Sequence, residues 1–365
     1  MRIAVLTSSR ADYSILSPLL FKIQRDYFFE LNLICFGSHL SEKHGKTMDQ
    51  ILKDGFEVHY AFNTNPLSDK PNSISNSIGN TIKKFTKIWS KEKYDLVLAI
   101  GDRYEMFAAC VSTIPFNIPI AHIHGGETTL GAFDDSFRHS ISQMSTIHFT
   151  ATEKYKNRVI EIKGENNNVF NVGALSIDNL MSLTLLSKLE FKEKFTIDIS
   201  LPSILITFQP ETVGFELNKR YVKILIDSLN EITEYQLIIT MPNADTMGNY
   251  IRRELEKFIK KSKNAIKIES FGTIGYLTCM KYCSMMLGNT SSGFIEAAYF
   301  PKYVINIGRR QEGRILTPNI NSIDIDRNQI LNAVNNYKDF KSSKYDGIYG
   351  NGHAGEKIIS ILKTK

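Results

Sequence analysis

The sequence is poor in cysteine, with four cysteines among 365 residues and no Cys-x-x-Cys pair. Such a set gives neither the disulfide framework of a small secreted domain nor the paired thiolates of a structural zinc site. Cys279 and Cys283 are four residues apart, so a helix would place both on one face. We expect buried, reduced thiols at all four positions.

A second metal-binding pattern is also incomplete. His122 and His124 are two residues apart on a predicted strand, so they would share one face of it. Zinc sites need at least three protein ligands, and no third ligand follows at a suitable spacing. We therefore expect no metal ion at these histidines.

The sequence has little that points to a membrane. The first residues, MRIAVLTSSRADYS, contain too short an apolar stretch for the hydrophobic region of a signal peptide. The longest uncharged run, residues 106–126, is interrupted by Pro115, Asn117 and Pro119, which is typical of a helix, a loop and a strand rather than of a membrane span. We expect a cytoplasmic protein with no membrane partner.

An excess of one charge is missing too. The 44 Lys and Arg residues against 38 Asp and Glu residues give a net charge of +6. This balance suits a phosphate-bearing ligand and is too diffuse to indicate a nucleic-acid partner. The sequence has no Walker A loop and no G-x-G-x-x-G motif, which disfavours P-loop NTPases and dinucleotide-dependent redox enzymes.

What is present is a globular composition, with 42% hydrophobic and 22% charged residues, in a chain long enough for two domains. Continuous apolar runs, each followed by helical spacing, predict parallel strands that helices cover on both faces. These runs lie at residues 3–6, 31–36, 96–100, 119–123, 204–208, 236–240, 265–269, 284–287 and 303–307. The pattern restarts after a polar stretch at 187–200, which predicts an α/β fold with two Rossmann-like domains.

Ligands of parallel sheets bind at the carboxyl ends of the strands, where this sequence is polar. The turn GNTSSG follows the predicted strand 284–287 and precedes a helix expected from Phe294. Ser291 and Ser292 in this turn suit a diphosphate, although a serine also serves as an ordinary helix cap. Glu296, about one turn into that helix, is a candidate for binding a ribose diol.

Three acids follow strands of the first half. Asp102 and Glu127 end the segments GD and HIHGGE, and Asp134 opens the helical segment DDSFRHSISQM. Acids that converge on one sheet edge suit general acid–base chemistry on a sugar. We interpret the neighbouring Asp135 as a cap or surface residue.

Two arginines stand at the same predicted edge. Arg10 precedes a predicted helix, and Arg103 follows Asp102. Guanidinium groups pair with phosphate through two parallel hydrogen bonds, so both are candidates for a diphosphate. Either arginine would also serve as a surface salt-bridge partner.

Nine segments, in order, resemble those of a known family. They are SRADYS, GSHLSEKHGKT, GDRYE, HIHGGE, FDDSFRH, PNADTMG, GNTSSGFIEA, INIGRRQEGRI and YGNGHAGEKI. Together they resemble the hydrolysing UDP-N-acetylglucosamine 2-epimerases of sialic acid biosynthesis and their relatives that act on UDP-2,4-diacetamido sugars. The resemblance covers nearly the whole chain.

The resemblance implies a GT-B architecture, in which two Rossmann-like domains with parallel sheets face a cleft. We place the first domain at 1–180 and the second at 181–352. We also expect a C-terminal helix, within 353–365, that returns to the first domain.

A reaction is implied as well. UDP is eliminated across C1–C2 to give a 2-acetamidoglycal, and water then adds with inversion at C2 to give N-acetylmannosamine and UDP. Protein carboxylates move the protons and cations hold the leaving diphosphate, so no metal or redox cofactor is expected. The partners are then the UDP-sugar substrate and the UDP product.

The resemblance assigns roles to individual residues. It implies proton transfer by Asp102, Asp134 and either His124 or Glu127. It implies contacts to substrate by Arg10, Ser14, Arg103, Gln209, Asn243, Phe271, Gly272, Ser291, Ser292 and Glu296, with uracil held largely by the backbone of the Phe271–Gly272 pair. Relatives commonly form dimers or tetramers, which by analogy predicts a homo-oligomer.

Two positions depart from the family pattern. His124 stands where the sialic acid enzymes often have a catalytic Glu, and Glu127 follows three residues on. Gln209 stands where relatives have a His, and glutamine can donate a hydrogen bond to phosphate but cannot carry a proton. We expect Gln209 to bind phosphate.

Several functions remain open on the sequence alone. The first expectation is UDP-N-acetylglucosamine as substrate, and the second is UDP-2,4-diacetamido-2,4,6-trideoxyglucose of legionaminic acid pathways, with His44, Lys46 and Thr47 as candidate readers of the sugar. HIHGGE, in place of a Glu-Ala-Gly turn, speaks against a non-hydrolysing epimerase. A GT-B glycosyltransferase and a non-catalytic UDP-sugar binding protein are the remaining alternatives.

Overall fold

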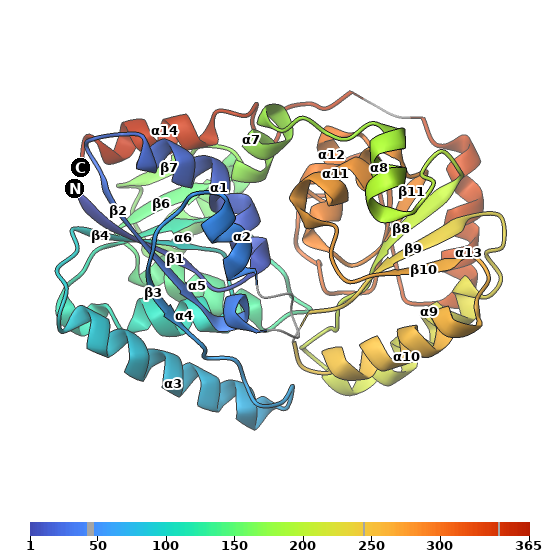
Figure 1. Ribbon diagram of the computed structural model, residues 1–365, viewed down its shortest axis with the longest axis horizontal. Coiled ribbons are helices and arrows are strands. Elements are labelled where there is room, and N and C mark those ends of the chain that lie inside the picture. The colour runs from blue at the N-terminus through green and yellow to red at the C-terminus, as the bar shows by residue number, and fades with distance from the viewer. Residues whose placement is uncertain (42–46, 244, 342–343) are drawn as a thin grey trace. The chain divides into compact units, whose positions relative to one another are not determined.

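The structure is a computed structural model of residues 1–365, and it describes all of them except 42–46, 244 and 342–343 (Figure 1). Contacts within the chain divide it into two compact units. The first comprises Met1–Glu127, Asp134–Ser182 and Ile348–Lys365, and the second comprises Thr128–Phe133 and Leu183–Gly347. The short segment Thr128–Phe133 thus leaves the first unit at one candidate acid, Glu127, and returns to it at another, Asp134.

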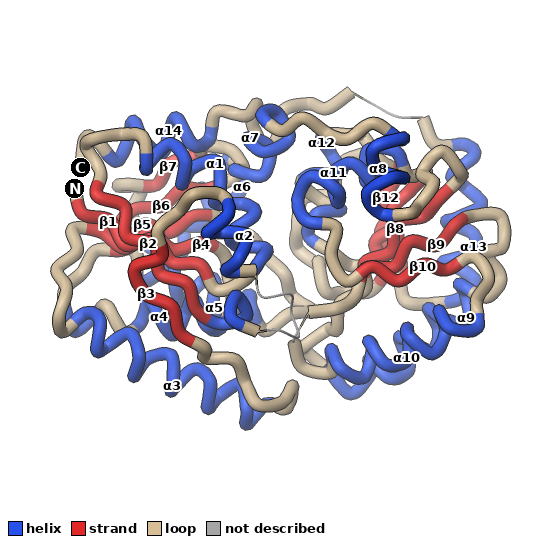
Figure 2. The backbone as a smooth tube through the Cα atoms, in the orientation of Figure 1, coloured by secondary structure: helices blue, strands red, loops and turns tan. Residues whose placement is uncertain are grey.

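The first unit is built on a parallel sheet. Within the described residues the sheet has seven strands in the order β3-β2-β1-β4-β5-β6-β7 (Figure 2). The strands are β1 (Arg2–Thr7), β2 (Glu30–Phe36), β3 (Val58–Phe62), β4 (Leu96–Ile100), β5 (Ile120–Ile123), β6 (Ile147–Thr150) and β7 (Val169–Asn171).

Helices cover both faces of this sheet. They are α1 (Arg10–Gln24), α2 (Met48–Lys53), α3 (Pro71–Trp89), α4 (Tyr104–Val111), α5 (Asp134–Met144), α6 (Glu153–Lys163), α7 (Leu175–Ser182) and α14 (Ala354–Leu362), with the 3₁₀ turns η1 (Gly37–Leu40) and η3 (Ile114–Phe116). One group packs in succession as α3, α4, α5 and α6, and a second consists of α1, α7 and α14. Buried Asp178 accepts hydrogen bonds from the backbone of Ala354 and Gly355 at 3.0 and 2.7 Å, which fixes the start of α14.

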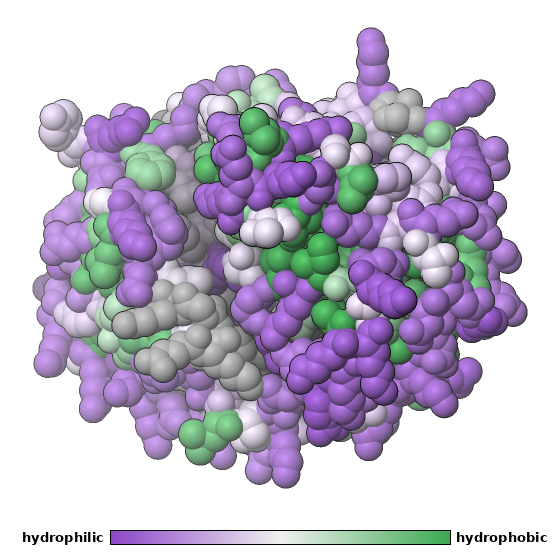
Figure 3. Space-filling model, turned by 45° about the vertical axis from the view of Figure 1, so that its right-hand side comes forward, coloured by the Kyte–Doolittle hydropathy of each residue, from purple (hydrophilic) through white to green (hydrophobic). Residues whose placement is uncertain are grey.

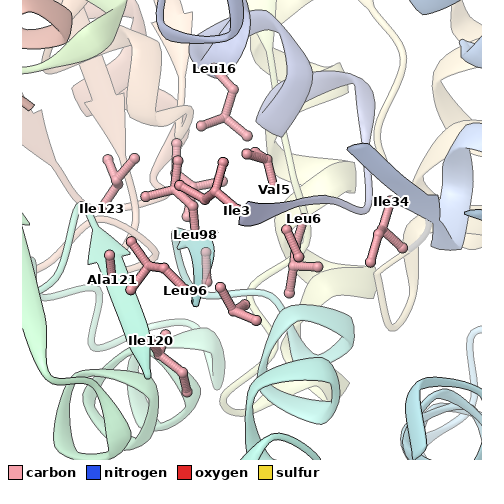
Figure 4. Close-up of a cluster of buried hydrophobic side chains, with 14 of the residues drawn as sticks. Ile3, Val5, Leu6, Leu16, Ile34, Leu96, Leu98, Ile120, Ala121 and Ile123 are labelled. Carbon is pink, nitrogen blue, oxygen red and sulfur yellow. The ribbon is translucent and has the colours of Figure 1, made fainter. Parts of the chain in front are cut away.

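The core of the first unit explains the continuous apolar runs. Side chains from β1, β2, β4, β5 and α1 meet in one cluster, in which Ile3, Val5 and Leu98 are fully buried (Figure 4). A central strand covered on both faces has no side that tolerates polar residues, so alternation is absent. The hydrophobic runs therefore position the strand ends that carry the polar motifs.

The second unit repeats this architecture. Within the described residues its parallel sheet has six strands in the order β10-β9-β8-β11-β12-β13. The strands are β8 (Ser203–Thr207), β9 (Gln236–Thr240), β10 (Ala265–Ile268), β11 (Met285–Gly288), β12 (Tyr303–Ile307) and β13 (Ile320–Ile323). The helices are α8 (Lys188–Phe195), α9 (Asn218–Leu229), α10 (Gly248–Lys261), α11 (Gly272–Tyr282), α12 (Glu296–Tyr299) and α13 (Arg327–Asn335), with the 3₁₀ turns η4 (Phe215–Leu217), η5 (Ser291–Gly293) and η6 (Asn336–Asp339).

Each sheet has a point at which the strand order reverses. In the first unit it lies between β1 and β4, and in the second between β8 and β11. Loops at the carboxyl ends of such a pair diverge to opposite sides, which leaves room for a ligand. The motifs after β1, β4, β8 and β11 all stand at these two points.

The predicted α/β class with two parallel sheets is confirmed. All nine predicted strands exist, with ends shifted by one residue at most. Four strands were missed, namely β3, β6, β7 and β13. The missed β3 has alternating exposure rather than a continuous apolar run, which is the pattern of an edge strand.

The surface is mostly hydrophilic in the face that Figure 3 presents. Among the described residues, no helix combines the length and the apolar character that a membrane span requires. All four cysteines lie in the described part of the chain and are buried with free thiols, as predicted. Burial raises the pKa of Cys35 to about 12 and that of Cys283 to about 11, so both remain protonated at neutral pH.

Candidate active site

The first strand end is organised around Asp12. Ser9 caps α1 and accepts a hydrogen bond from the Asp12 backbone, while the Asp12 carboxylate accepts from the Ser8 backbone at 2.9 Å and from the Ser8 hydroxyl at 2.6 Å. These bonds tie the turn after β1 to the first turn of α1. They place Arg10 at the first position of the helix and Ser14 one turn later.

Asp102 is the second residue after β4 and forms an ion pair with Arg138 of α5. The Arg138 side chain is only 2% exposed, and its Nη1 also donates to the backbone carbonyl of Glu127 at 2.9 Å. Asp135 approaches the same guanidinium at 3.7 Å. One buried arginine thus links two of the predicted acids.

Arg138 was not among the residues predicted from the sequence. Its position four residues after Asp134 would place both on one face of α5, which was an available signal. The missing information was tertiary, because the Asp102 carboxylate reaches Arg138 from 36 residues earlier in the chain. A buried arginine with no carboxylate partner would be strongly destabilising, so the pair also supports the fold.

Arg103 has a local partner. Its Nε and Nη2 donate to the two carboxylate oxygens of Glu105 at 3.2 and 3.1 Å. Glu105 is buried, with a side chain 1% exposed, whereas Arg103 remains 16% exposed. The pair holds the guanidinium of Arg103 at the edge of the sheet next to Asp102.

His122 has a supporting role. It lies on β5, where Nε2 contacts the Gly101 carbonyl at 2.8 Å and Nδ1 contacts the Ser142 hydroxyl at 3.0 Å. Burial lowers the pKa of His122 to about 4, so the ring is neutral at pH 7. Its contact with Gly101 orients the turn that carries Asp102.

His124 differs from the expectation of a face shared with His122. The strand β5 ends at Ile123, and His124 adopts a left-handed backbone with φ of 63°. Its Nδ1 lies 2.8 Å from Oε1 of Glu127, which is 3% exposed. The two histidines therefore serve different partners.

Asp134 is the first residue of α5, and its side chain is buried. Asp135 follows it in the first helical turn and lies 3.4 Å from Nε2 of His139. Acidic residues in a first turn favour the helix dipole, which explains part of this pattern. Asp135, which the sequence suggests as a cap or surface residue, is the second residue of α5, and its side chain is 18% exposed.

The segment Thr128–Phe133 is bound within the second unit. Leu130 donates to the Glu312 carbonyl at 3.0 Å, and the Gly131 carbonyl accepts from Thr212 at 3.1 Å. A Cβ at Gly131 would lie 2.5 Å from backbone atoms of Arg309, so the close approach requires glycine. Glu127 and Asp134 therefore flank a segment whose position is set by contacts within the second unit.

In the second unit, Gln209 follows β8 and is held by its neighbours. Its backbone N–H donates to Oδ1 of Asn289 at 2.7 Å, and its Oε1 accepts from the backbone of Asn243 at 2.9 Å. The predicted residues Gln209 and Asn243 are thus joined. Asn289, which is fully buried, was not predicted, because its role is visible only from contacts between strand ends.

The GNTSSG turn begins at a position that requires glycine. Gly288 has φ of 143°, and a Cβ there would lie 2.0 Å from the Thr207 carbonyl oxygen. The helix expected from Phe294 is instead the 3₁₀ turn η5 followed by α12, which spans only four residues and starts at Glu296. A single helical turn has a small dipole, so any anion here would depend on local N–H and hydroxyl groups.

Ser292 is fixed by two hydroxyl groups. The Tyr276 hydroxyl lies 2.6 Å from its Oγ, and the Thr290 hydroxyl lies 3.1 Å from it. Thr207 is a further hydrogen-bond partner of the Tyr276 side chain. Burial raises the pKa of Tyr276 to about 12, so the phenol keeps its proton.

Phe271 and Gly272 precede and begin α11. The Phe271 ring packs against Phe191 and Phe195, with centroid distances of 5.3 and 4.9 Å. Gly272 is exposed with φ of 66°. The Phe271 ring therefore belongs to the core, and the Gly272 N–H donates to the Ser270 hydroxyl at 3.1 Å.

A second set of contacts surrounds Asn289. Its backbone carbonyl accepts from Nη1 of Arg310 at 3.2 Å and from Nε2 of Gln311 at 2.9 Å. Buried Glu211 accepts from the Arg309 backbone at 2.6 Å, and burial raises the pKa of that carboxyl. The loop after β12 is thereby bound to the loops after β8 and β11.

Two other expectations concern ligands. Among the described residues, no group of three or more His, Cys, Asp and Glu side chains is arranged to hold a metal ion. Of the candidate sugar readers, His44 and Lys46 lie outside the described residues. Thr47 is described, and its hydroxyl lies 2.7 Å from Nδ1 of buried His39.

The fold and the strand-end motifs place the chain in the class of two-domain α/β proteins with the GT-B fold, as the sequence predicts. A solved structure of this class, the UDP-GlcNAc 2-epimerase from Neisseria meningitidis bound to UDP-GlcNAc, matches with a TM-score of 0.84 at 19% identity. The match covers 100% of both chains.

The chain belongs to the UDP-N-acetylglucosamine 2-epimerase family, whose sequence profile matches residues 21–363. It is 34% identical over 345 residues to the Campylobacter jejuni protein named GDP/UDP-N,N'-diacetylbacillosamine 2-epimerase (hydrolyzing), covering 94% of this chain and 89% of the relative. It is 31% identical over 363 residues to the Legionella pneumophila protein named UDP-N,N'-diacetylbacillosamine 2-epimerase (hydrolyzing), covering 100% and 96%. The resemblance stated from the sequence is confirmed.

Proposed function

We propose that this chain is a hydrolysing 2-epimerase of UDP-linked 2-acetamido sugars. A base removes the proton at C2, the electron pair of that bond forms the C1–C2 double bond, and UDP leaves with the pair of the C1–O bond. Water then adds to C1 of the 2-acetamidoglycal, and a proton returns to C2 from the opposite face. The products are UDP and the free 2-epimeric sugar.

The observation that carries this proposal is the cluster of Asp102, Arg138, Glu127 and His124 at one edge of the first sheet. Inversion at C2 needs proton transfer on both faces of that carbon, so more than one proton carrier is required. The cluster offers two carboxyl groups and an imidazole. Asp134, at the start of α5, is a further carrier in this proposal.

The leaving diphosphate is assigned to the second unit. Oε1 of Gln209 accepts the Asn243 N–H, which leaves the amide hydrogens of Nε2 to donate. Phosphate oxygens accept hydrogen bonds, so Gln209 suits phosphate binding without carrying a proton. Ser291 and Ser292 supply hydroxyl donors in the same proposal.

The other substrate contacts follow the family resemblance. We assign Arg10, Ser14 and Arg103 to phosphate or nearby sugar atoms, and Asn243 to the same ligand. Glu296 is assigned to the ribose hydroxyls, and the backbone of Phe271 and Gly272 to uracil.

Two substrates fit this reaction. UDP-N-acetylglucosamine is the first expectation from the sequence, and UDP-2,4-diacetamido-2,4,6-trideoxyglucose is the second. The names of the Campylobacter and Legionella relatives favour the second, because N,N'-diacetylbacillosamine is that 2,4-diacetamido sugar. We therefore propose the diacetamido sugar nucleotide as the preferred substrate.

The experiment compares the two sugar nucleotides at equal concentration with the purified chain. UDP release and the free sugar are followed by proton NMR. We expect UDP and a free 2-epimer, formed faster from the diacetamido substrate. A UDP-linked epimer would indicate a non-hydrolysing enzyme, and binding without turnover of either compound would indicate a UDP-sugar binding protein or a glycosyltransferase that needs an acceptor.

A further inference from the structure

His124 occupies an unusual position for a histidine. It stands one residue beyond the end of β5, with a left-handed backbone, and its side chain is 8% exposed. Nδ1 lies 2.8 Å from Oε1 of Glu127, whose side chain is 3% exposed. Both partners are thus held in place by the turn that joins them.

When Glu127 is ionised, this contact determines the tautomer of the ring. An ionised carboxylate only accepts hydrogen bonds, so Nδ1 of His124 carries the hydrogen and donates it to Glu127. In the neutral ring, Nε2 then carries the lone pair. This atom is buried and makes no hydrogen bond to any residue that the structure describes. A buried polar atom without a partner is costly and calls for a functional or structural explanation.

Three other described histidines of the first unit lack this combination. His122 uses both ring nitrogens in contacts with Gly101 and Ser142. His148, in the middle of β6, has no carboxylate partner among the described residues, and burial lowers the pKa of His148 to about 3. His139 lies farther from its carboxylate, at 3.4 Å from the partly exposed Asp135.

We propose that His124 and Glu127 act as a dyad, in which Nε2 of His124 accepts the C2 proton of the UDP-sugar and Glu127 is the positioning residue. This inference rests on the proposed function. The pair of the C2–H bond becomes the C1–C2 double bond, and the pair of the C1–O bond leaves with UDP. Nε2 ends with the proton, so the imidazolium formed lies against the Glu127 carboxylate.

The surroundings of Glu127 suit this role. Its backbone carbonyl is held by Arg138, which also pairs with Asp102. A fixed carboxylate keeps the ring orientation and the tautomer, as in other carboxylate–histidine pairs that transfer protons. Asp102 and Asp134 then remain for the hydration step, where water must lose a proton and C2 must regain one.

His124 and Glu127 are three residues apart, and both side chains are nearly fully buried. The pair thus supplies a base and its counter-charge in one turn of the chain.

The test uses His124→Asn, whose Nδ2 can keep the bond to Glu127 while removing the base, with His124→Gln as a second variant should the first be unstable. Glu127→Gln and the double variant His124→Asn/Glu127→Gln complete the cycle. Exposed His59, on β3, provides His59→Gln as a matched control. UDP affinity is measured for each protein, and so are UDP release from both sugar nucleotides and hydration of a synthetic 2-acetamidoglycal.

We expect His124→Asn to slow UDP release by about 10²- to 10⁴-fold, the usual contribution of a general base. UDP affinity should stay within about threefold, because the base acts in the transition state. Glu127→Gln should slow UDP release by at least about tenfold. The double variant should release UDP no more slowly than His124→Asn alone, since the effects of substitutions in residues that act as a unit are not additive. The glycal should still be hydrated by His124→Asn.

Three outcomes would overturn the dyad. They are UDP release by His124→Asn within tenfold of wild type, fully additive losses in the double variant, and equal losses of UDP release and glycal hydration. The first removes His124 as a base, the second shows that Glu127 acts independently, and the third shows a general structural defect. Failure of the wild type to release UDP from either sugar nucleotide would instead overturn the proposed function itself.

Discussion

Asn289 and Gln209 hold each other through two reciprocal hydrogen bonds between the ends of β8 and β11. The Gln209 N–H donates to Oδ1 of Asn289 at 2.7 Å, and Nδ2 of Asn289 donates to the Gln209 carbonyl at 2.8 Å. The amide side chain thus imitates the pairing of a neighbouring strand after the sheet has ended. It fixes the position of Gln209, the proposed hydrogen-bond donor to phosphate, relative to the GNTSSG turn.

Removing the Asn289 side chain should destabilise the fold. We expect Asn289→Ala to lower the free energy of unfolding by about 2–4 kcal/mol, since it leaves a buried N–H and a buried carbonyl of Gln209 without their partner. Exposed Asn167 offers the control Asn167→Ala, which should change stability by less than about 0.5 kcal/mol. Urea denaturation measures both, and equal stability of the two variants would contradict the role of Asn289.

The ion pair of Asp102 and Arg138 makes a prediction about turnover. We expect Arg138→Lys to lower kcat by about 100-fold, because a lysine point charge cannot hold both the Asp102 carboxylate and the Glu127 carbonyl in the same geometry. Asp102→Asn should abolish turnover and leave UDP affinity within a few-fold, since the side chain is assigned to proton transfer. Steady-state kinetics and calorimetric UDP titration measure the two effects.

The control is Arg158→Lys, since Arg158 forms an exposed pair with Glu161. This variant should retain wild-type kcat. Loss of UDP binding in a folded Asp102→Asn protein would show that Asp102 serves mainly to bind the ligand.

Gly288 should tolerate no side chain. A Cβ would meet the Thr207 carbonyl oxygen at 2.0 Å, and the backbone has φ of 143°. We expect Gly288→Ala to destabilise the protein by about 3 kcal/mol or more. Gly79, inside α3, has no described atom within 4 Å of its would-be Cβ, so Gly79→Ala should be neutral or stabilising by about 0.5–1 kcal/mol. Thermal unfolding measures both variants, and a higher melting temperature for Gly288→Ala than for Gly79→Ala would contradict this account.

Tyr276 should influence UDP through Ser292. When Ser292 donates its hydrogen to a phosphate, its oxygen can accept the hydrogen of the Tyr276 phenol at 2.6 Å. We expect Tyr276→Phe to weaken UDP binding by about fivefold, the scale of one lost hydrogen bond. Tyr282→Phe, at the end of the same helix, is the matched control. Equal UDP affinities of these two variants would show that the phenol does not orient Ser292.

Acid should destabilise the first unit through its buried histidines. Burial lowers the pKa of His39 and His122 to about 4 and that of His148 to about 3, from 6.5. Between pH 6.5 and 4 the unfolded chain takes up these protons and the folded chain does not, so the free energy of unfolding falls as pH falls. The slope approaches about 1.4 kcal/mol per pH unit for each histidine.

Urea denaturation at pH 7, 6 and 5 measures this slope. His148→Leu should reduce this slope by the contribution of one histidine, about 1.4 kcal/mol per pH unit, because the variant lacks the titrating ring. A free energy of unfolding that does not change between pH 7 and 5 would contradict the assignment.

Much of the fold was predictable because burial leaves a strong pattern. Runs such as Leu96–Ile100 and Gln236–Thr240 are covered on both faces, and their predicted bounds match the structure. β7 has only three residues and β3 alternates in exposure, so neither gives a continuous apolar run. Edge strands carry less of the hydrophobic signal from which the central strands were found.

The candidate site was predictable only in its parts. The strand-end motifs identified Asp102, Glu127 and Gln209 as residues to inspect. Their partners Arg138 and Asn289 were missed because these contacts join residues far apart in the sequence, at separations of 36 and 80 positions for the Asp102 and Gln209 pairs. The turn of His124 toward Glu127 depends on a left-handed backbone, which a strand pattern does not reveal.

The most direct test of the central claim is the reaction of the diacetamido sugar nucleotide in heavy water, followed by proton NMR. We predict UDP and a free sugar with inverted configuration at C2 and deuterium on that carbon, because the returning proton comes from a group that exchanges with solvent. A UDP-linked product, or a free sugar that keeps its C2 configuration and its original hydrogen, would contradict the proposal that this chain is a hydrolysing 2-epimerase.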